Sequence, residues 1–292
     1  MLAEIHIIPA LGTVPLQRLT AAQLNSLYAD LLAGGRCDGK GGLSPRTVAY
    51  VHATIRKALA EAVRWQVLTR NVADQATPPR QQPNGDLRTW SAEELRAFLG
   101  HVEADRLYAA YVLAATTGLR RGELLGLRWR DLDVAAGRLS VTQTLVSVNY
   151  AVSFSTPKTA AGRRSVALDP ATVAALRAHR ARLLEERLSL GLGTPSPDDV
   201  VFAALDGSPL HPGQFSDRFD RLVKTAGVPR IRFHDLRHTH ATLALRAGVH
   251  PKVVSERLGH STISVTLDTY SHAIPAMQEE AAAKVAALVF GG

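Results

Sequence analysis

The sequence predicts a mainly α-helical protein with a small antiparallel β-sheet (α+β), divided into a helical first domain and a larger second domain. Apolar residues recur at helical spacing over long stretches near both ends of the chain. Shorter segments rich in β-branched residues lie between turn formers in the middle of the chain. The stretch "ATPPRQQPNGD", residues 76–86, concentrates Pro, Gly and polar residues, so we expect the interdomain linker there.

Two consecutive helices are expected in the first domain. Thr20 with Gln23 forms a capping box, and Gly34 supplies a helix stop. Ser44 and Pro45 fit the N-cap and N1 positions of a longer amphipathic helix. The apolar stripe of that helix consists of Val48, Val51, Ile55, Leu59, Val63 and Val67. Its other faces carry Arg46, Arg56, Lys57 and Arg64.

The second domain begins with another capping box, formed by Ser91 with Glu94, and helical patterns continue to about residue 127. Segments 138–148 and 164–168 favour strands because β-branched residues there are flanked by turn formers. Helical patterns dominate again from residue 170 onward. We find no internal repeat and no low-complexity tract.

Composition narrows the class of protein. No apolar run in the 292 residues approaches the roughly 20 that a membrane-spanning helix needs, and the first residues lack the basic flank of a signal peptide. We therefore expect a cytoplasmic protein with no membrane partner. Cys37 is the single cysteine, which excludes an internal disulfide and is too few for a cysteine-built metal site.

The charge favours a polyanionic partner. The chain has a net charge of +8 and a pI near 10.0, and each phosphate neutralised by Lys or Arg releases condensed counterions. Only six of the 34 basic residues are lysines. Arginine makes bidentate phosphate contacts but cannot readily give up a proton, so the few lysines are candidates for a role that requires proton release.

One segment resembles a phosphate-binding P-loop. Residues 34–40 read "GGRCDGK", but Gly41 stands where Ser or Thr should hold magnesium, and a helix rather than a strand precedes the segment. A flexible Gly-rich turn explains these residues, and we expect no ATP cofactor.

A second segment resembles a zinc peptidase motif. "HDLRHTH" places His234 and His238 four residues apart, on one face of a helix, yet Asp235 stands where those enzymes need Glu. Satisfied helix histidines, or a phosphate-binding His234, are the favoured interpretations, and we expect no metal.

Several further residues could carry chemistry. In "TTGLRRGELLGL", Arg120 follows a glycine turn and Glu123 comes three residues later, although an exposed helix ion pair would explain this pattern equally well. Lys158 lies in a turn between predicted strands and is the only lysine between Lys57 and Lys224. A solvated hairpin lysine is the alternative interpretation.

The remaining candidates lie near the carboxyl end. His234 and Arg237 are three residues apart, so on a helix they share a face and can converge on one anion. In "LGHSTISVTLDTYSH", His260 follows an expected helix end at Gly259, and Tyr270 comes ten residues later. Taken singly, such a tyrosine is usually packing and such a histidine usually structural.

Taken together, these residues resemble the active site of the tyrosine recombinase (phage integrase) family in order and in local motif, over almost the whole second domain. The resemblance implies a catalytic domain with Tyr270 as the nucleophile. The six positions that it assigns to catalysis are all filled, by Arg120, Lys158, His234, Arg237, His260 and Tyr270.

The expected chemistry suits these residue types. Attack of Tyr270 on a backbone phosphate gives a 3′-phosphotyrosine bond, and the arginines and histidines stabilise the charge of the transition state. Lys158 can give a proton to the leaving 5′-oxygen, and His234 is the candidate that assists removal of the tyrosine proton. The covalent link retains the ester bond, so resealing needs neither ATP nor metal.

Two acidic residues near these positions are expected to orient catalytic groups. We interpret Glu123 and Asp235 as partners of the arginines and the histidine, with ordinary helix ion pairs as the alternative. His238 and His240 receive no role.

The resemblance also implies a domain division. Residues 1–82 correspond to a helical core-type DNA-binding domain without the family's first two helices, and residues 83–292 to the catalytic domain. The implied partners are double-stranded DNA with specific recombination sites, further copies of the chain in a tetramer on DNA, and accessory DNA-bending proteins.

Two other functions are alternatives to a recombinase. A nicking and closing enzyme of the type IB topoisomerase kind uses closely similar chemistry, and a DNA-binding relative without activity is the non-enzyme alternative. The complete set of six residues argues against the latter, and the wording "LGHSTISVTLDTY" favours recombinases over topoisomerases.

A last amphipathic helix is expected beyond Tyr270. Its apolar positions, Met277, Ala281, Val285, Leu288 and Val289, recur at helical spacing. Such a helix can pack on its own domain or dock on a neighbouring protomer, as the resemblance suggests.

Overall fold

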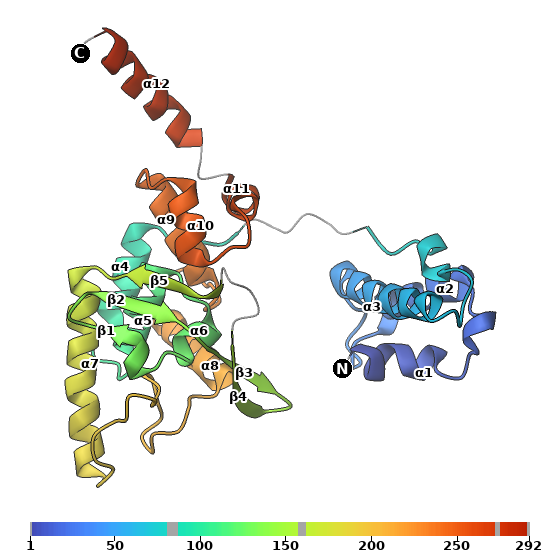
Figure 1. Cartoon of the computed structure of the whole chain (residues 1–292), viewed down its shortest axis with the longest axis horizontal. Coiled ribbons are helices and arrows are strands. Elements are labelled where there is room, and N and C mark those ends of the chain that lie inside the picture. Colours follow the sequence, from blue (N-terminus) through green and yellow to red (C-terminus); the bar gives the residue numbers. More distant parts are fainter. Residues whose placement is uncertain (1, 81–86, 157–161, 272–274, 291–292) are drawn as a thin grey trace. The chain divides into compact units, whose positions relative to one another are not determined.

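The computed structural model describes residues 2–80, 87–156, 162–271 and 275–290. The chain divides into two compact units, Met1–Asp86 and Leu87–Gly292 (Figure 1). This junction lies close to the boundary expected after residue 82. The described strands all lie in the second unit and all pair in antiparallel fashion, while helices predominate in both. The predicted fold class is therefore confirmed.

Two helices form the framework of the first unit, α2 (Ala21–Gly34) and α3 (Pro45–Arg64). The Gln23 amide donates a hydrogen bond to the Thr20 hydroxyl, and the Thr20 amide donates one to the Gln23 side chain, so the predicted capping box begins α2. The Ser44 hydroxyl caps α3 in the predicted way. Shorter helical turns complete the unit at Ala3–Ile7, α1 (Ile8–Leu11), Leu16–Arg18 and Val72–Gln75.

The core of the first unit lies between α2 and α3. Its buried side chains are Leu19, Leu24, Leu27, Tyr28, Leu31, Val48, Val51, Ile55, Leu59 and Ala73. The predicted apolar stripe is confirmed from Val48 to Leu59 but is wrong at Val67, whose side chain is 45% exposed. The helix ends at Arg64, and Gln66 has a φ of 60°, so the chain leaves the helical path before Val67.

The segment that resembles a P-loop, residues 34–40, forms a turn after α2. The Arg36 guanidinium donates hydrogen bonds to both carboxylate oxygens of Asp38, at 3.0 and 2.6 Å, and the Lys40 amide donates one at 3.1 Å. A carboxylate of the chain thus engages the donors that a bound phosphate would need. These contacts explain the turn without a nucleotide.

The second unit contains two small antiparallel sheets. One has the strand order β1-β2-β5, and the other is the hairpin β3-β4. The strands are β1 (Leu132–Asp133), β2 (Arg138–Val141), β3 (Thr144–Val148), β4 (Ala151–Ser155) and β5 (Arg164–Ala167). Asn149 and Tyr150 both have positive φ, 48° and 63°, as a two-residue hairpin turn of the I′ type requires.

The strand structure expected over residues 138–148 is confirmed, but the chain changes sheets within it, from β2 to β3. Between β2 and β3, the Thr142 hydroxyl accepts a hydrogen bond from the Arg128 guanidinium at 2.9 Å. The Gln143 amide group donates one to the Gly126 carbonyl at 2.9 Å. Both residues are held by groups that are distant in sequence, so local β propensity could not reveal the break.

Helices pack around the sheets of the second unit (Figure 1). They are α4 (Ala92–His101), α5 (Tyr108–Thr117), α6 (Arg121–Leu125), α7 (Pro170–Ser189), α8 (Pro212–Ala226), α9 (Asp235–Arg246), α10 (Pro251–Leu258), α11 (Ile263–Tyr270) and α12 (Pro275–Phe290). The helix expected beyond Tyr270 is thus present as α12. Within the described ranges, no helix is both long enough and apolar enough to span a bilayer.

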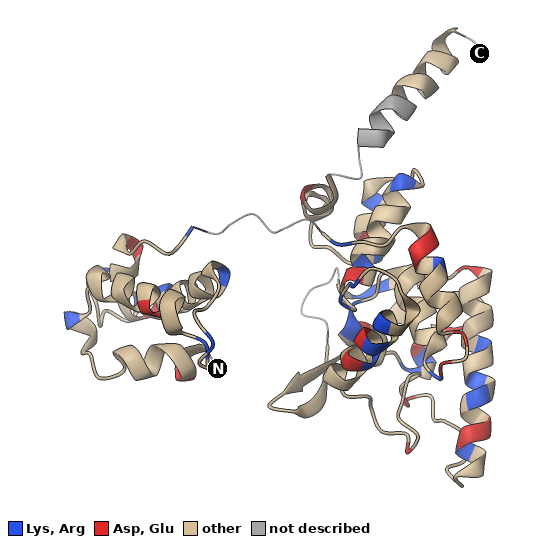
Figure 2. Ribbon diagram, turned by 180° about the vertical axis from the view of Figure 1, so that it is seen from behind, with Lys and Arg blue, Asp and Glu red and all other residues tan. Residues whose placement is uncertain are grey.

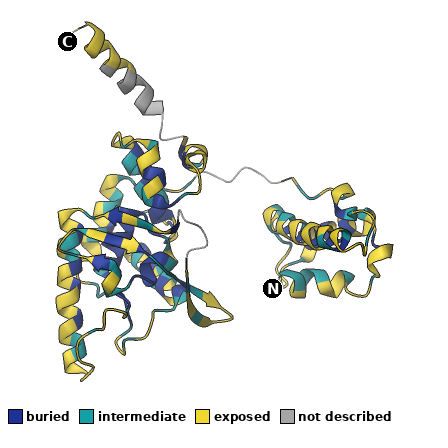
Figure 3. Cartoon of the chain, viewed as in Figure 1, coloured by how far each residue is buried: buried dark blue, intermediate teal, exposed yellow. Residues whose placement is uncertain are grey.

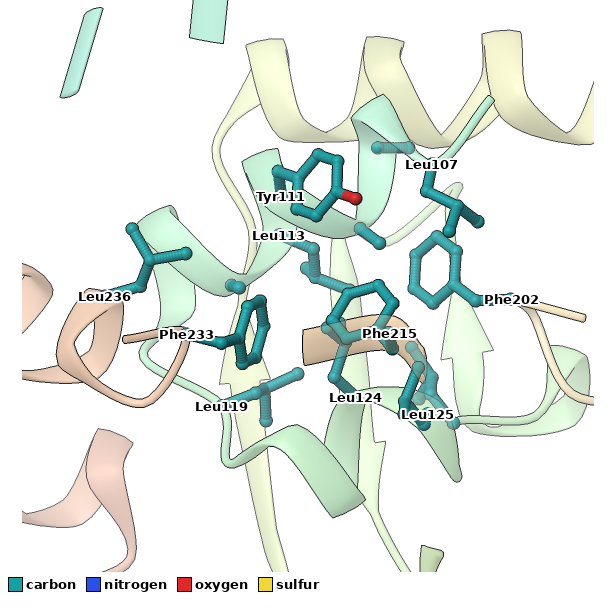
Figure 4. Packing of buried hydrophobic residues seen from close by; sticks show 14 of the residues in the cluster. Leu107, Tyr111, Leu113, Leu119, Leu124, Leu125, Phe202, Phe215, Phe233 and Leu236 are labelled. Carbon is teal, nitrogen blue, oxygen red and sulfur yellow. The ribbon is translucent and has the colours of Figure 1, made fainter. Parts of the chain in front are cut away.

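Helix α5 lies at the centre of the core of the second unit. Nearly every residue of α5 is buried, which is typical of a helix covered on all sides (Figure 3). Its Tyr111 ring stacks on Phe215 of α8 with 5.7 Å between the ring centroids, and Phe215 packs edge-on against Phe233 at 4.9 Å (Figure 4). This packing fixes the carboxyl end of α5, where the candidate site begins.

Candidate active site

Five of the six predicted site residues lie at or near the ends of helices in the second unit. Arg120 precedes α6, His234 and Arg237 lie at the start of α9, His260 follows α10, and Tyr270 ends α11. Lys158 lies outside the described residues. Helices α9, α10 and α11 lie side by side and bring these segments together (Figure 1).

A glycine turn places Arg120. Gly118 ends α5 with a φ of 66°, a conformation that favours glycine. A Cβ atom at this position would lie 2.6 Å from the Leu258 side chain and 2.9 Å from the His240 ring. The left-handed backbone and the close approach therefore both require glycine, and the turn leads the chain directly into Arg120.

Arg120 is held by Glu123 and by a backbone carbonyl. The Arg120 Nη1 donates to Glu123 Oε1 at 2.8 Å, its backbone amide donates to Glu123 Oε2 at 2.9 Å, and its Nη2 donates to the Gly259 carbonyl at 3.1 Å. The side chain is still 41% exposed. The expectation that Glu123 orients an arginine therefore agrees with these contacts.

A second arginine, Arg164 of β5, shares the same carboxylate. Its Nη2 lies 2.8 Å from Glu123 Oε2 and its Nη1 lies 3.1 Å from Oε1, while its Nε donates to the Arg257 carbonyl at 2.6 Å. Burial of Glu123 opposes its charge, but the bonds and charge of Arg164, then those of Arg120, outweigh it and lower the pKa of Glu123. Arg164 could not be found from the sequence, since nothing local connects it to Glu123.

Arg237 is buried, with 4% of its surface exposed, and is held by carbonyl groups. Its Nη1 donates to the Gly118 carbonyl at 2.8 Å and its Nη2 to the Leu258 carbonyl at 2.7 Å. Burial, and then repulsion from Arg120, lowers the pKa of Arg237 to about 9, so the side chain remains cationic at neutral pH. Among the described residues, no carboxylate forms an ion pair with it.

His260 lies beside the tyrosine. Its Nδ1 is 2.7 Å from the Thr266 hydroxyl, and its ring stacks on Tyr270 with 6.5 Å between the centroids. Burial, and then the charges of Arg237 and Arg120, lowers the pKa of His260 to about 4. The ring is therefore neutral at pH 7, and when Thr266 donates to Nδ1 the hydrogen on Nε2 is left for another acceptor.

Tyr270 is 1% exposed, and its hydroxyl lies 2.9 Å from Nδ1 of His238. Burial raises the pKa of Tyr270 to about 12, although Arg237 and Arg120 act in the opposite direction. Burial also lowers the pKa of His238 to about 4. His238 had no role in the prediction from the sequence, although its position one helical turn after His234 and next to Arg237 was a usable signal.

His234, and Asp235 beside it, have different surroundings. The His234 ring packs edge-on against His238 at 5.1 Å, so His238 rather than His234 contacts the tyrosine hydroxyl among the described residues. Asp235 accepts hydrogen bonds from the backbone amide, Nε and Nη2 of Arg232. The expectation that Asp235 orients a catalytic arginine or histidine was therefore wrong, because its carboxylate closes the turn that begins α9.

The arrangement suits an anion next to a phenol. The charges of two guanidinium groups, Arg237 and Arg120, act on Tyr270, and together they have more positive charge than Glu123 can balance. His260 and His238 are neutral groups that can donate or accept hydrogen bonds. Within the described part of the chain, no group of three or more His, Cys, Asp or Glu side chains could hold a metal ion.

The sequence model of the phage integrase family matches residues 88–277, which is more than half of the chain and nearly all of the second unit. The chain belongs to this family.

Named relatives agree with this family. The chain is 34% identical over 216 residues to a tyrosine recombinase XerC-like protein of Caldanaerobacter subterraneus subsp. tengcongensis, a match that covers 70% of this chain and 55% of the relative. It is 29% identical over 248 residues to the ICEBs1 integrase of Bacillus subtilis, covering 84% and 66% of the two chains. The chain thus spans less than two thirds of the length of either relative.

Solved structures show the same fold. An integrase of the transposon Tn1549 in complex with transposon right end DNA has a TM-score of 0.75 at 24% identity, covering 94% of this chain and 88% of that one. A lambda integrase tetramer bound to a Holliday junction has a TM-score of 0.62 at 20% identity, covering 90% and 69%.

Proposed function

We propose that this chain is a site-specific DNA recombinase that cleaves and rejoins DNA strands through a covalent bond between Tyr270 and a 3′-phosphate. The observation that carries the proposal is the pair of cations beside the tyrosine. Arg237 is buried without a described carboxylate partner, and Arg120 is half exposed and shares its single carboxylate with Arg164. Such a site is stabilised by an anion, and a phosphodiester supplies one at the nucleophile.

Each residue has a role in this reaction. The Tyr270 hydroxyl gives up its proton, with His234 as the proposed acceptor, while its oxygen attacks the phosphorus and the 5′-oxygen leaves. Charge on the phosphate oxygens is stabilised by Arg120 and Arg237. His260 and His234 add hydrogen bonds to the same oxygens. Lys158 is the proposed donor of the proton that the 5′-oxygen gains, because a lysine can release a proton where an arginine cannot. Resealing reverses these steps and uses the energy retained in the phosphotyrosine bond.

The first unit is proposed as the second part of a DNA clamp. Its helix α3 carries Arg56 and Arg64 on exposed faces, paired with Asp74 and Glu61 respectively. Basic residues occur on both units (Figure 2), and the net charge of +8 favours DNA over an uncharged partner. Residues 1–82 would then serve as the core DNA-binding domain and residues 83–292 as the catalytic domain.

The proposed partners are DNA with specific recombination sites and further copies of the chain, in a tetramer on DNA, together with accessory DNA-bending proteins. The proposed place of action is on DNA in the cytoplasm. The assembly is supported by the lambda integrase, which is a tetramer on a Holliday junction. A nicking and closing activity of the type IB topoisomerase kind is the second candidate, because it needs the same tyrosine and cations.

One experiment tests the covalent chemistry. Nicked duplexes that carry a candidate recombination site are incubated with wild-type protein and with Tyr270→Phe, and complexes that survive denaturation are counted. We expect the adduct with wild type only, while both proteins bind the duplex equally in a gel shift. An adduct that persists in the Phe variant would overturn the assignment of the nucleophile.

A second assay separates the two enzyme functions. Recombination between two sites on one plasmid is measured beside relaxation of a supercoiled plasmid without sites. A recombinase gives recombined products, whereas a topoisomerase gives relaxation alone.

A further inference from the structure

His238 has a contact that the six family positions do not explain. Its Nδ1 lies 2.9 Å from the Tyr270 hydroxyl, and the two ring centroids are 5.7 Å apart. Among the described residues, it is the only side chain with a hydrogen bond to that hydroxyl. The tyrosine is almost fully buried, so water does not replace this contact.

The ionisation of both groups and the tautomer of His238 together set the direction of this bond. Burial keeps Tyr270 protonated, with a pKa raised to about 12, so the phenol is a hydrogen donor. Burial also keeps His238 neutral at pH 7, with a pKa lowered to about 4, so one ring nitrogen is an acceptor. In the tautomer of His238 that carries its hydrogen on Nε2, the phenol O–H donates to Nδ1, and the lone pairs of the oxygen remain free for another direction.

We propose that His238 positions the nucleophile: its Nδ1 accepts the hydrogen bond of the Tyr270 hydroxyl and so turns the phenol oxygen toward the phosphate held by Arg120 and Arg237. This inference rests on the proposed recombinase function and adds a seventh residue to the site. The two pKa values lie far apart in the direction that disfavours a resting proton transfer, so His238 acts by position and not as the initial base.

The fold fixes this histidine from several sides. Asp235 and Arg232 close the first turn of α9, which sets the start of the helix one turn before His238. The His234 ring packs edge-on against the His238 ring at 5.1 Å. The charged or titratable groups that act on His238 are His234, Asp235, Arg237, Arg232 and the facing His260 and Tyr270.

Two amide substitutions test the position of the acceptor. In His238→Asn the side-chain oxygen can take the place of Nδ1, whereas in His238→Gln the amide reaches toward the place of Nε2. Both amides are polar, neutral and unable to accept a proton at pH 7. We expect His238→Asn to form the phosphotyrosine adduct within about fivefold of the wild-type rate, and His238→Gln to be slower by about 100-fold, as for a misplaced reacting group.

Matched controls separate this effect from folding and binding. His250→Asn is the control, because His250 caps α10 through Nδ1 outside the site, and asparagine can make the same cap bond. Its adduct rate should equal wild type. Thermal melts and gel shifts of all variants should agree within a few degrees and about threefold in affinity.

The outcomes are distinct. Equal adduct rates for the Asn and Gln variants, whether both fast or both slow, would overturn the positioning role while the wild-type adduct still supports the recombinase. Absence of an adduct from wild-type protein that binds the DNA would instead overturn the proposed function itself.

Discussion

Replacing Arg164 by Met should destabilise the second unit and slow DNA cleavage, although Arg164 is not one of the six family positions. The Arg164 and Glu123 side chains are 7% and 6% exposed, and two hydrogen bonds of 2.8 and 3.1 Å join them. Removing one partner of a buried ion pair typically costs about 3–5 kcal/mol, because the other charge is left without compensation. For a unit of this size that corresponds to a Tm lower by roughly 6 to 20 °C.

The double variant Arg164→Met/Glu123→Gln identifies the cause. If Arg164 acts by neutralising Glu123, then removing both charges should be less harmful than the sum of the two single changes, with a coupling above about 1 kcal/mol. Urea unfolding of wild type, both single variants and the double variant measures this coupling directly. Strictly additive losses would refute the reasoning and would make Arg164 a packing residue.

The rate of DNA cleavage should also depend on the balance of charge between Arg164 and Glu123. Without Arg164, Glu123 would pair with Arg120 alone and cancel more of the charge that we assign to phosphate binding. We expect the adduct rate of Arg164→Met to fall at least about tenfold, and the added Glu123→Gln change to restore part of it, since a glutamine can still accept hydrogen bonds from Arg120. An adduct rate that falls further in the double variant would contradict this account.

Three further tests address other parts of the molecule. Lys158→Arg should lose most cleavage, and a substrate with sulfur in place of the 5′-leaving oxygen should restore it; no preference for sulfur would exclude Lys158 as the acid. Cleavage should survive EDTA, while the logarithm of the DNA binding constant falls by about 0.9 per phosphate contact per log unit of salt; zinc-restored cleavage would instead support a metal at His234 and His238. Burial, and then the charge of Arg257, lowers the pKa of His240 to about 4. The contribution of His240 to folding stability should therefore be constant above pH 7. It should fall between about pH 6.5 and 4, because only the unfolded chain gains the proton there. The variant His240→Asn can still donate a hydrogen bond to the Ala115 carbonyl. Between these two pH values, its free energy of unfolding should fall by up to about 3 kcal/mol less than that of wild type. If the urea midpoints of the two proteins shift equally with pH, the result would contradict this role of His240.

Sequence patterns predicted the features of the fold that local interactions determine. The capping boxes at Thr20 and Ser91 involve neighbours three residues apart, and the structure contains both. The break after β2 and the whole of β4 were not predicted. The first depends on bonds from Thr142 and Gln143 to groups distant in the sequence, and the second on a hairpin whose turn includes Tyr150 at a positive φ, a conformation uncommon for tyrosine.

The site shows the same limit. The order of motifs led to residues that the structure brings together around Tyr270, because each motif is a short local string. Arg164 and His238 were missed, since their significance lies in the contacts with Glu123 and Tyr270 that only the folded chain creates. Asp235 was assigned to the wrong partner for the complementary reason: its local cap with Arg232 satisfies its carboxylate, leaving no need for a distant one.

The balance of charge around the proposed nucleophile gives a physical reason for its preference for phosphate. Arg120 and Arg164 share one described carboxylate, Glu123, and Arg237 has no described carboxylate partner, so these three arginines retain two positive charges. A bound phosphodiester has one negative charge, and a second develops when the Tyr270 oxygen attacks without its proton. The cations therefore match the transition state better than the ground state, which is the condition for catalysis. A neutral methylphosphonate linkage would remove one of those negative charges, and it should be cleaved faster by Arg237→Ala, relative to the ordinary phosphate, than by wild type. An identical preference in the two proteins would show that Arg237 does not act through the phosphate charge.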